Sequence, residues 1–100
     1  MKFKILFQPE AKAEFFAAIS WYENQAAGLG HEFAREALKC IEVAQLAPER
    51  FRPVRGRARC IRLKRFKAYS IYFATKGDVF AVISIFHGAR NPDDLRKRLP

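Results

Sequence analysis

The spacing of apolar and polar residues divides the first half of the chain into a strand and two helices. Residues 2–7 alternate between polar and apolar side chains, which predicts a half-buried strand. In residues 9–26 and again in residues 30–47, apolar side chains recur at helical spacing, and a Gly-Leu-Gly break separates the two stretches. Two amphipathic helices joined by so short a break predict a helical hairpin.

The second half of the chain changes to strand-like spacing. Residues 49–56 contain a proline and a glycine and are expected to be irregular. Residues 57–64 and 66–74 predict two strands, and a Lys-Gly-Asp hairpin turn leads from them into residues 79–86. That last run is apolar except for one serine, which is typical of a central strand covered on both faces. Residues 91–99 predict a short helix with an asparagine cap and a proline at its first position.

The order strand, helix, helix, strand, strand, strand, short helix predicts an α+β domain. Its sheet is expected to be mostly antiparallel and to carry the helical hairpin on one face. Half of the 100 residues are hydrophobic and ten are phenylalanine, so the chain can bury a core. That length predicts a single domain spanning residues 1–100.

Charge is the most informative part of the composition. The net charge is +9, and residues 50–67 alone contain nine basic and no acidic residues. Arginine outnumbers lysine there by seven to two, and the arginine fork suits phosphate and carboxylate partners. We expect these side chains to gather on one exposed side of the sheet, facing a polyanion or an acidic protein. The seven glutamates of the first half are expected on solvent faces of the helices.

Several classes of protein are excluded by what the sequence lacks. It contains no apolar run long enough to cross a bilayer and no signal-peptide pattern, so we expect a cytoplasmic protein without membrane contact. Cys40 and Cys60 are far apart and stand in no Cys/His cluster, which predicts reduced, buried thiols and no metal or cofactor. No P-loop, Ser/His/Asp set or pair of catalytic carboxylates is present.

Four segments occur in an order that is typical of one family. They are Phe7-Gln8-Pro9-Glu10-Ala11 leading into Ile19-Ser20-Trp21-Tyr22-Glu23; Gly28-Leu29-Gly30-His31-Glu32-Phe33; Arg62-Leu63-Lys64-Arg65-Phe66 followed by Tyr69-Ser70-Ile71-Tyr72-Phe73; and Phe86-His87-Gly88-Ala89-Arg90-Asn91-Pro92. Together they resemble the RelE/ParE superfamily of bacterial type II toxins, and its ParE-like branch in particular. One departure is Lys67-Ala68, where the family usually has Pro-Tyr.

The resemblance implies the toxin component of a type II toxin–antitoxin, or plasmid stabilisation, system. Such a toxin arrests growth, is neutralised by a cognate antitoxin with an acidic C-terminal segment, and meets operator DNA only through that antitoxin. The ParE branch implies inhibition of DNA gyrase without enzymatic activity. The alternative is a RelE-like, metal-independent mRNA endonuclease acting on the ribosome. A third alternative is a stabilisation module that has lost its toxicity, and fold alone does not choose among them.

The candidate residues differ between the two main hypotheses. The expected surface for antitoxin and target comprises Arg57, Arg59, Arg62, Lys64, Arg65, Tyr69, Tyr72 and Trp21. In the nuclease alternative, His87 would be the base, and Arg90 with Arg59 or Arg62 would steady the phosphate. No residue after His87 can transfer a proton near neutral pH, so we expect its ring instead to hold the following turn by a local hydrogen bond. Tyr69 and Tyr72 are expected on opposite faces of their strand.

Overall fold

The computed structural model describes residues 3–100, so Lys2, the first residue of the predicted N-terminal strand, lies outside it. The elements are β1 (Lys4–Phe7), α1 (Pro9–Gln25), α2 (Leu29–Leu46), the 3-10 helix η1 (Pro48–Arg50), β2 (Arg52–Arg55), β3 (Ala58–Arg62), β4 (Tyr69–Lys76), β5 (Val79–His87) and α3 (Pro92–Arg96). The strands form one sheet in the order β1-β5-β4-β3-β2, antiparallel except for the parallel pair β1 and β5. The α+β prediction is confirmed.

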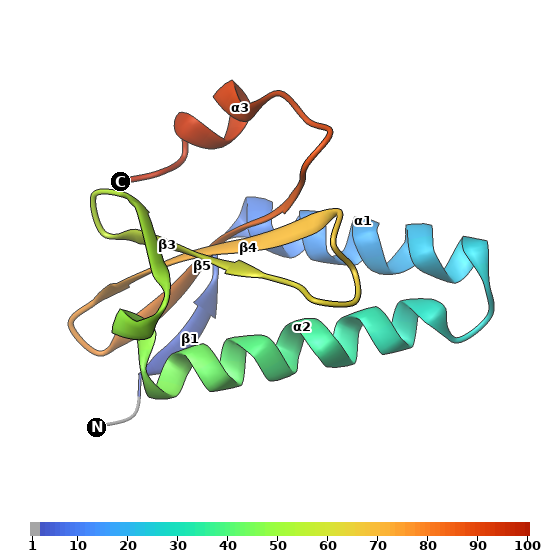
Figure 1. Ribbon diagram of the computed structural model, residues 1–100, viewed down its shortest axis with the longest axis horizontal. Coiled ribbons are helices and arrows are strands. Elements are labelled where there is room, and N and C mark those ends of the chain that lie inside the picture. Colours follow the sequence, from blue (N-terminus) through green and yellow to red (C-terminus); the bar gives the residue numbers. More distant parts are fainter. Residues whose placement is uncertain (1–2) are drawn as a thin grey trace.

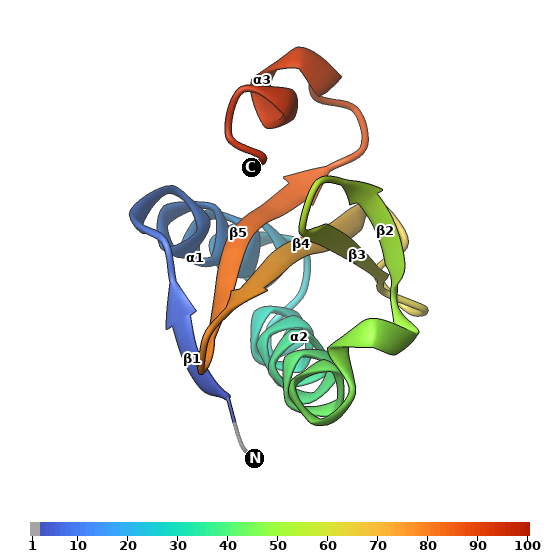
Figure 2. The same ribbon diagram turned by 90° about the vertical axis from the view of Figure 1, so that its left-hand side faces the viewer.

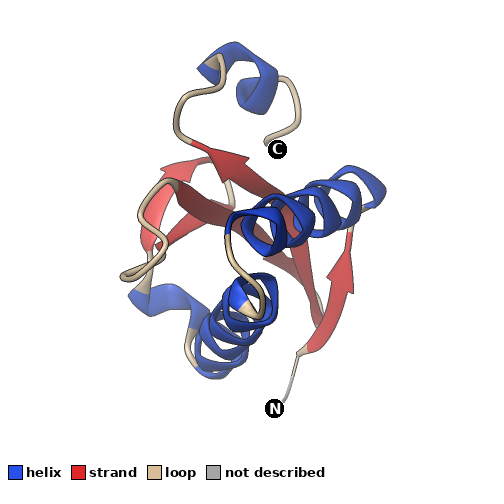
Figure 3. Ribbon diagram, turned by 90° about the vertical axis from the view of Figure 1, so that its right-hand side faces the viewer, coloured by secondary structure: helices blue, strands red, loops and turns tan. Residues whose placement is uncertain are grey.

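The molecule has three layers: the helical hairpin, the sheet, and the C-terminal segment that contains α3 (Figures 1 and 2). Helices α1 and α2 run side by side as a hairpin (Figure 1) and cover one face of the sheet (Figure 3). Helix α3 and the end of the chain lie on the far side of the sheet from that hairpin (Figures 2 and 3). Within residues 3–100, no helix combines the length and apolarity that a bilayer crossing requires.

The prediction that residues 49–56 are irregular is wrong. Residues 48–50 form η1, and β2 pairs antiparallel with β3 at the outer edge of the sheet. The proline within β2 is tolerated because an edge strand has one side free of ladder hydrogen bonds, and the pairing register shifts between Pro53 and Arg55. The predicted second strand begins later than expected, at Tyr69, because Phe66 turns into the core instead of extending the sheet.

The main core lies between the helical hairpin and the sheet. Phe33 of α2 is fully buried and stacks against Tyr22, with their ring centroids 5.1 Å apart, and Phe66 meets it edge-on at 5.2 Å. Phe73 and Phe80 stack 4.4 Å apart across the β4–β5 hairpin. A smaller apolar layer lies outside this cluster, on the other side of the sheet, and comprises Ala58, Cys60, Ile83, Phe86 and Leu95. Strand β5 is therefore covered on both faces, as the sequence predicted.

The α1–α2 connection depends on a close approach of the two helices. Gly28 adopts a left-handed conformation with φ of 85°, which favours glycine. The Glu23 carboxylate accepts hydrogen bonds from the amides of Gly28 and Gly30, at 2.8 and 3.0 Å. A Cβ atom on Gly30 would lie 2.5 Å from the carbonyl oxygen of Ile19. The glycine at position 30 is therefore required by packing between the helices.

We expect Gly30→Ala to lower the free energy of unfolding by about 2 kcal/mol, because overpacking against a fixed backbone atom outweighs the higher helix propensity of alanine. Urea denaturation followed by circular dichroism would measure the change. Gly88→Ala is the matched control, since a Cβ there would meet its nearest atom at an ordinary 3.5 Å. Equal stability of the two variants would contradict this account of the hairpin.

Candidate partner-binding surface

The sheet face opposite the helical hairpin carries arginine and aromatic side chains in register. Arg52 pairs with Cys60 and Cys60 with Tyr72, so these side chains follow one another across β2, β3 and β4. Arg62 and Phe86 stand in the next row, on either side of β4. Because the residues adjacent to these along each strand belong to the core under the helices, alternation directs this set to the opposite face.

Aromatic and guanidinium groups pack together on this face. The rings of Tyr72 and Phe86 meet edge to face with centroids 6.4 Å apart, and the Arg90 guanidinium lies over the Phe86 ring at 4.7 Å. Burial and the neighbouring Cys60 thiol raise the pKa of the Tyr72 hydroxyl, while the positive charges of Arg52 and Arg62 act in the opposite direction. We call Arg52, Arg62, Tyr72, Phe86 and Arg90 the open-face cluster.

Glu14 of α1 contacts both Arg90 of the open-face cluster and Arg98 near the C-terminus. Its carboxylate pairs with Arg90 at 2.5 Å and with Arg98 at 2.8 Å, and it accepts a hydrogen bond from the Ser84 hydroxyl at 2.9 Å. Its side chain is only 15% exposed, so the expectation that all seven glutamates lie on solvent faces is wrong. Burial alone would raise the pKa of the Glu14 carboxyl, but the hydrogen bonds from Arg98, Arg90 and Ser84 and the charge of Arg98 lower it below its ordinary value.

The Glu14–Arg98 pair also forms hydrogen bonds with main-chain groups at one edge of β5. Strand β1 covers this edge only as far as the amide of Gln8, which donates to the Val82 carbonyl at 3.0 Å. Beyond that point the Ile85 amide donates to Glu14 at 3.1 Å, and the Ile83 carbonyl accepts from Arg98 at 2.6 Å. The two side chains thus satisfy main-chain groups that a neighbouring strand would otherwise satisfy.

The C-terminal helix is docked by contacts on both of its sides. Asn91 caps it as predicted, accepting a hydrogen bond from the Asp93 amide at 3.0 Å. Leu95 is 7% exposed, and the Arg55 guanidinium donates to the Arg96 carbonyl at 3.3 Å. The Arg98 pair described above adds a charged contact from the other side. Together these contacts place α3 at the border of the open-face cluster.

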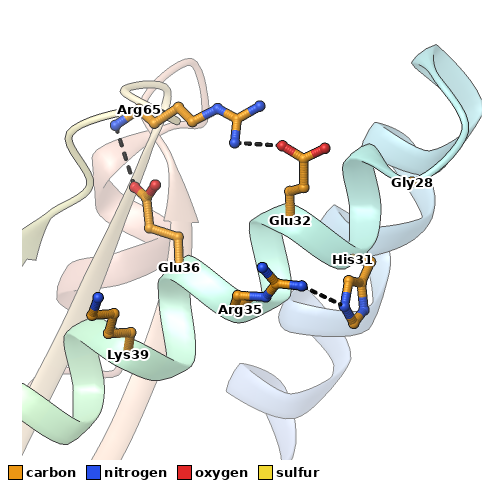
Figure 4. Close-up of a pocket in the computed structure, with 7 residues that line it drawn as sticks. All are labelled: Gly28, His31, Glu32, Arg35, Glu36, Lys39 and Arg65. Carbon is orange, nitrogen blue, oxygen red and sulfur yellow. Dashed lines mark hydrogen bonds and ion pairs between the residues drawn. The ribbon is translucent and has the colours of Figure 1, made fainter.

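The remaining arginines of residues 50–67 do not share this face. Arg59 pairs in register with the buried Phe73, on the side of the sheet that faces the helices. Its guanidinium donates a hydrogen bond to the Phe51 carbonyl at 2.7 Å. The Arg65 guanidinium pairs with Glu32 of α2 at 2.5 Å, and its amide donates to Glu36 at 3.2 Å (Figure 4). The expectation that the basic side chains gather on one exposed side is therefore wrong, because the alternation of β3 and the chain's own glutamates and carbonyls divide them.

A pocket of about 570 Å³ lies beside Arg65 on the surface of α2, lined by Gly28, His31, Glu32, Arg35, Glu36, Lys39 and Arg65 (Figure 4). Arg35 contacts the His31 ring at 3.2 Å, and Glu32 and Glu36 both engage Arg65. Both carboxylates of this pocket are thus engaged by Arg65. Burial raises the pKa of the Cys40 thiol of the same helix, and the positive charge of the exposed Lys64 acts in the opposite direction.

The other predicted contact residues occupy three separate places. Arg57 is exposed in the β2–β3 turn and lines a pocket of about 240 Å³ beside Arg98. Trp21 is 55% exposed on α1 and packs edge-on against Tyr22, with centroids 5.1 Å apart. Tyr69 faces the helices, on the side of β4 opposite Tyr72, as the odd separation predicted. Of the eight predicted contact residues, Arg62 and Tyr72 lie in the open-face cluster.

Two members of the cluster, Arg52 and Phe86, were not among the eight named contact residues, because their placement depends on strand pairing. Arg52 lies in the segment that was expected to be irregular, and Phe86 resembles any residue of a buried strand. The signal that locates both is the register of β2 with β3 and of β4 with β5.

The residues of the nuclease alternative are only partly brought together. His87 pairs across the sheet with Tyr69, and its ring Nδ1 accepts a hydrogen bond from the Ala89 amide at 2.9 Å. It lines a pocket of about 80 Å³ with Arg90 and Glu14, well below the ~300 Å³ that binding sites for small molecules usually reach. Arg62 projects from the opposite sheet face. Residues 3–100 also contain no group of His, Cys, Asp and Glu side chains that could hold a metal ion.

A five-stranded sheet with a helical hairpin on one face is the architecture that the resemblance to the RelE/ParE superfamily implied. The family model described as "ParE toxin of type II toxin-antitoxin system, parDE" matches residues 5–92, and the chain therefore belongs to this family. A solved structure, "Chromosomal ParDE TA system from P. aeruginosa", is similar with a TM-score of 0.72 and 18% identity, covering 86% of this chain and 96% of that one. No curated protein sequence gives a significant match.

Proposed function

We propose that the chain is a growth-arresting toxin that inhibits DNA gyrase and is neutralised by a cognate antitoxin. The single observation that carries this proposal beyond the family is the open-face cluster. Arg52 and Arg62 are exposed there around Tyr72, and no carboxylate of residues 3–100 forms an ion pair with either arginine. Two unpaired guanidinium groups beside an aromatic ring form a surface suited to an acidic protein segment.

The antitoxin is the partner that this charge distribution favours. A net charge of +9 attracts an acidic segment at long range, and the exposed arginines give it short-range partners. Operator DNA is then reached only through the antitoxin, in keeping with toxin–antitoxin systems. Both proposed partners are cytoplasmic, which makes the cytoplasm the proposed site of action.

The position of His87 favours gyrase inhibition over mRNA cleavage. The ring is engaged with the turn that follows it and stands on the face opposite Arg62. A general base must lie within hydrogen-bonding reach of the proton that it removes and close to the groups that stabilise the phosphate. That requirement is not met by His87 with Arg59 and Arg62 in this arrangement.

A supercoiling assay tests the proposed target. With saturating toxin, purified gyrase is expected to lose supercoiling activity, and added antitoxin is expected to restore it. His87→Ala should arrest growth as strongly as the original chain, because the ring has no chemical step to perform. Normal supercoiling in the presence of toxin would exclude gyrase as the target. Codon-linked cuts in translated messages, abolished by His87→Ala, would instead establish the nuclease.

A further inference from the structure

An irregularity in β2 brings two of its arginines to the same side of the sheet. Arg52 and Arg55 are three residues apart and would face opposite sides of a regular strand. The pairing register shifts between Pro53 and Arg55, so that Arg52 pairs with Cys60. Arg55 then pairs with Ala58, two residues from Cys60 on β3. Both partners lie in the apolar layer opposite the helical hairpin, and both arginines therefore face that side.

Arg62 extends these two positions into a line along the outer edge of the sheet. Along β3, residue 62 is Arg62 itself, residue 60 lies opposite Arg52, and residue 58 lies opposite Arg55. Alternate residues on one face of a strand are about 7 Å apart, which sets the repeat of the line. Arg57 follows in the β2–β3 turn, and Figure 2 shows β2 at the edge of the sheet away from β1. We call Arg62, Arg52, Arg55 and Arg57 the arginine row.

The charges of the arginine row are available to a partner. All four side chains are exposed, and none of them forms an ion pair within residues 3–100. Arg55 donates to the main-chain carbonyl of Arg96, an uncharged acceptor, so its positive charge remains uncompensated. Glu49 is the one acidic residue between positions 48 and 57, and Asp93 at the border of the face is paired with Arg96. The row is therefore a linear array of unpaired positive charge.

The position of the row favours contacts through side chains over the addition of a strand. Pro53 has no amide proton and the register shift interrupts β2, so a partner strand would find no regular ladder at this edge. The planar fork of arginine binds a phosphate group through two parallel hydrogen bonds. Duplex DNA presents one phosphate for about every 3.4 Å of axis in each strand, so a repeat of about 7 Å matches every second phosphate.

We propose that the arginine row binds the phosphate backbone of double-stranded DNA. Contacts with phosphate oxygens position a protein on the duplex without reading its bases, so recognition of the operator sequence stays with the antitoxin. The inference rests on the proposed function in one respect, namely that the DNA met in the cell is the segment held by gyrase. The toxin then contacts both components of the protein–DNA complex that it inhibits.

The salt dependence of DNA binding tests the row directly. Fluorescence anisotropy of a short labelled duplex of mixed sequence, titrated with the purified chain at several salt concentrations, gives the binding constant at each. Four phosphate contacts predict that its logarithm falls with the logarithm of the salt concentration with a slope of about −3 to −4. The double variant Arg52→Ala, Arg62→Ala should reduce the magnitude of the slope by about two and weaken binding at least about tenfold.

A variant with the same loss of charge elsewhere provides the control. Arg35→Ala combined with Lys39→Ala removes two exposed cations from α2, on the opposite side of the sheet, and should change the slope far less. Equal losses for the two double variants would show that net charge alone attracts DNA and would overturn the proposed row. Unchanged thermal melting of both variants would confirm that each one folds.

Comparison of nucleic acids and of gyrase inhibition separates this inference from the proposed function. Two duplexes of unrelated sequence should bind equally, and tighter binding of single-stranded DNA or RNA than of the duplex would overturn the inference. Absence of duplex binding at low salt, with gyrase still inhibited by the same preparation, would overturn the inference and leave the proposed function intact. Binding of duplex DNA with normal supercoiling by gyrase would support the row and overturn the proposed target.

Discussion

Glu14→Gln is expected to lower the free energy of unfolding by about 2–3 kcal/mol, which corresponds to roughly 10–20 °C in melting temperature for a domain of this size. The substitution retains the shape of the side chain but removes its charge, leaving the guanidinium groups of Arg98 and Arg90 without their carboxylate. Arg98 is itself largely buried at 18% exposure, so water replaces the lost partner poorly. Thermal melting and urea denaturation at pH 7 would measure the effect.

A conservative change at an exposed ion pair provides the control. Asp93→Asn removes the partner of Arg96, but both side chains of that pair are more than 60% exposed, at 62% and 63%. Exposed pairs contribute little to stability because water solvates the separated charges and salt screens them. We therefore expect a change below about 0.5 kcal/mol for Asp93→Asn. A similar loss in the two variants would show that burial is not what makes the Glu14 network stabilising.

The stability difference between the original chain and Glu14→Gln should depend on pH. The pKa of Glu14 in the folded chain lies below its ordinary value of 4.5, so the carboxylate stabilises the fold at any pH above 4.5. As the pH falls below 4.5 and through the folded pKa, both states become protonated and the advantage over the glutamine variant disappears. A difference that stays constant down to strongly acidic pH would contradict the proposed role of the charge.

The same substitution should loosen the C-terminal segment before the rest of the molecule. Glu14 accepts a hydrogen bond from the Ile85 amide and holds Arg98 against the Ile83 carbonyl at the β5 edge, so removing its charge weakens both contacts and admits water to these groups more often. Hydrogen exchange of the Ile85 amide should accelerate more in Glu14→Gln than exchange at Phe73 in the centre of the sheet. Uniform acceleration at both sites would indicate general destabilisation without local opening.

Arg62→Glu is expected to weaken antitoxin binding by about a hundredfold or more at physiological salt, with little change in stability. The guanidinium is exposed beside Tyr72 and has no acidic partner within residues 3–100, so reversing its charge removes no internal contact. Placing a carboxylate against an acidic segment costs several kcal/mol through repulsion and the loss of a charge-assisted hydrogen bond. Isothermal titration or biolayer interferometry with purified antitoxin would measure the change in affinity.

Arg59→Glu and Arg65→Glu separate this effect from a general change in charge. Arg59 donates to the Phe51 carbonyl, so its reversal should reduce the melting temperature by removing an internal hydrogen bond. Arg65 pairs with Glu32 on the helical side, so its reversal should affect antitoxin binding far less than that of Arg62. Affinity for the unaltered chain should also fall as salt rises, because exposed charges are screened over about 8–10 Å. Equal losses for all three arginines would mean that net charge, and not the open-face cluster, governs binding.

Local patterns in the sequence were sufficient to locate most of the fold. Helical periodicity predicted α1 and α2 to within a residue or two, and the Lys-Gly-Asp turn with the apolar run after it predicted the β4–β5 hairpin. Gly77 in that turn has a φ of 59°, as such a turn requires. These predictions are accurate because the patterns behind them depend on residues close together in the chain. The edge strand β2 was missed because it forms through pairing with β3, which local propensity does not report.

The sequence by itself determined the class of fold, the local excess of arginine, and the opposite directions of Tyr69 and Tyr72. The tertiary structure alone decided which arginines are available, because neighbours from distant segments decide what each guanidinium meets. Glu32 forms an ion pair with Arg65, and the Phe51 carbonyl accepts a hydrogen bond from Arg59. Arg62 forms no ion pair within residues 3–100 and is available to a partner. The role of Glu14 was likewise invisible in the sequence, since Arg98 lies 84 residues away from it along the chain. Charge can be counted along a sequence, but whether a charge is paired depends on three-dimensional contacts.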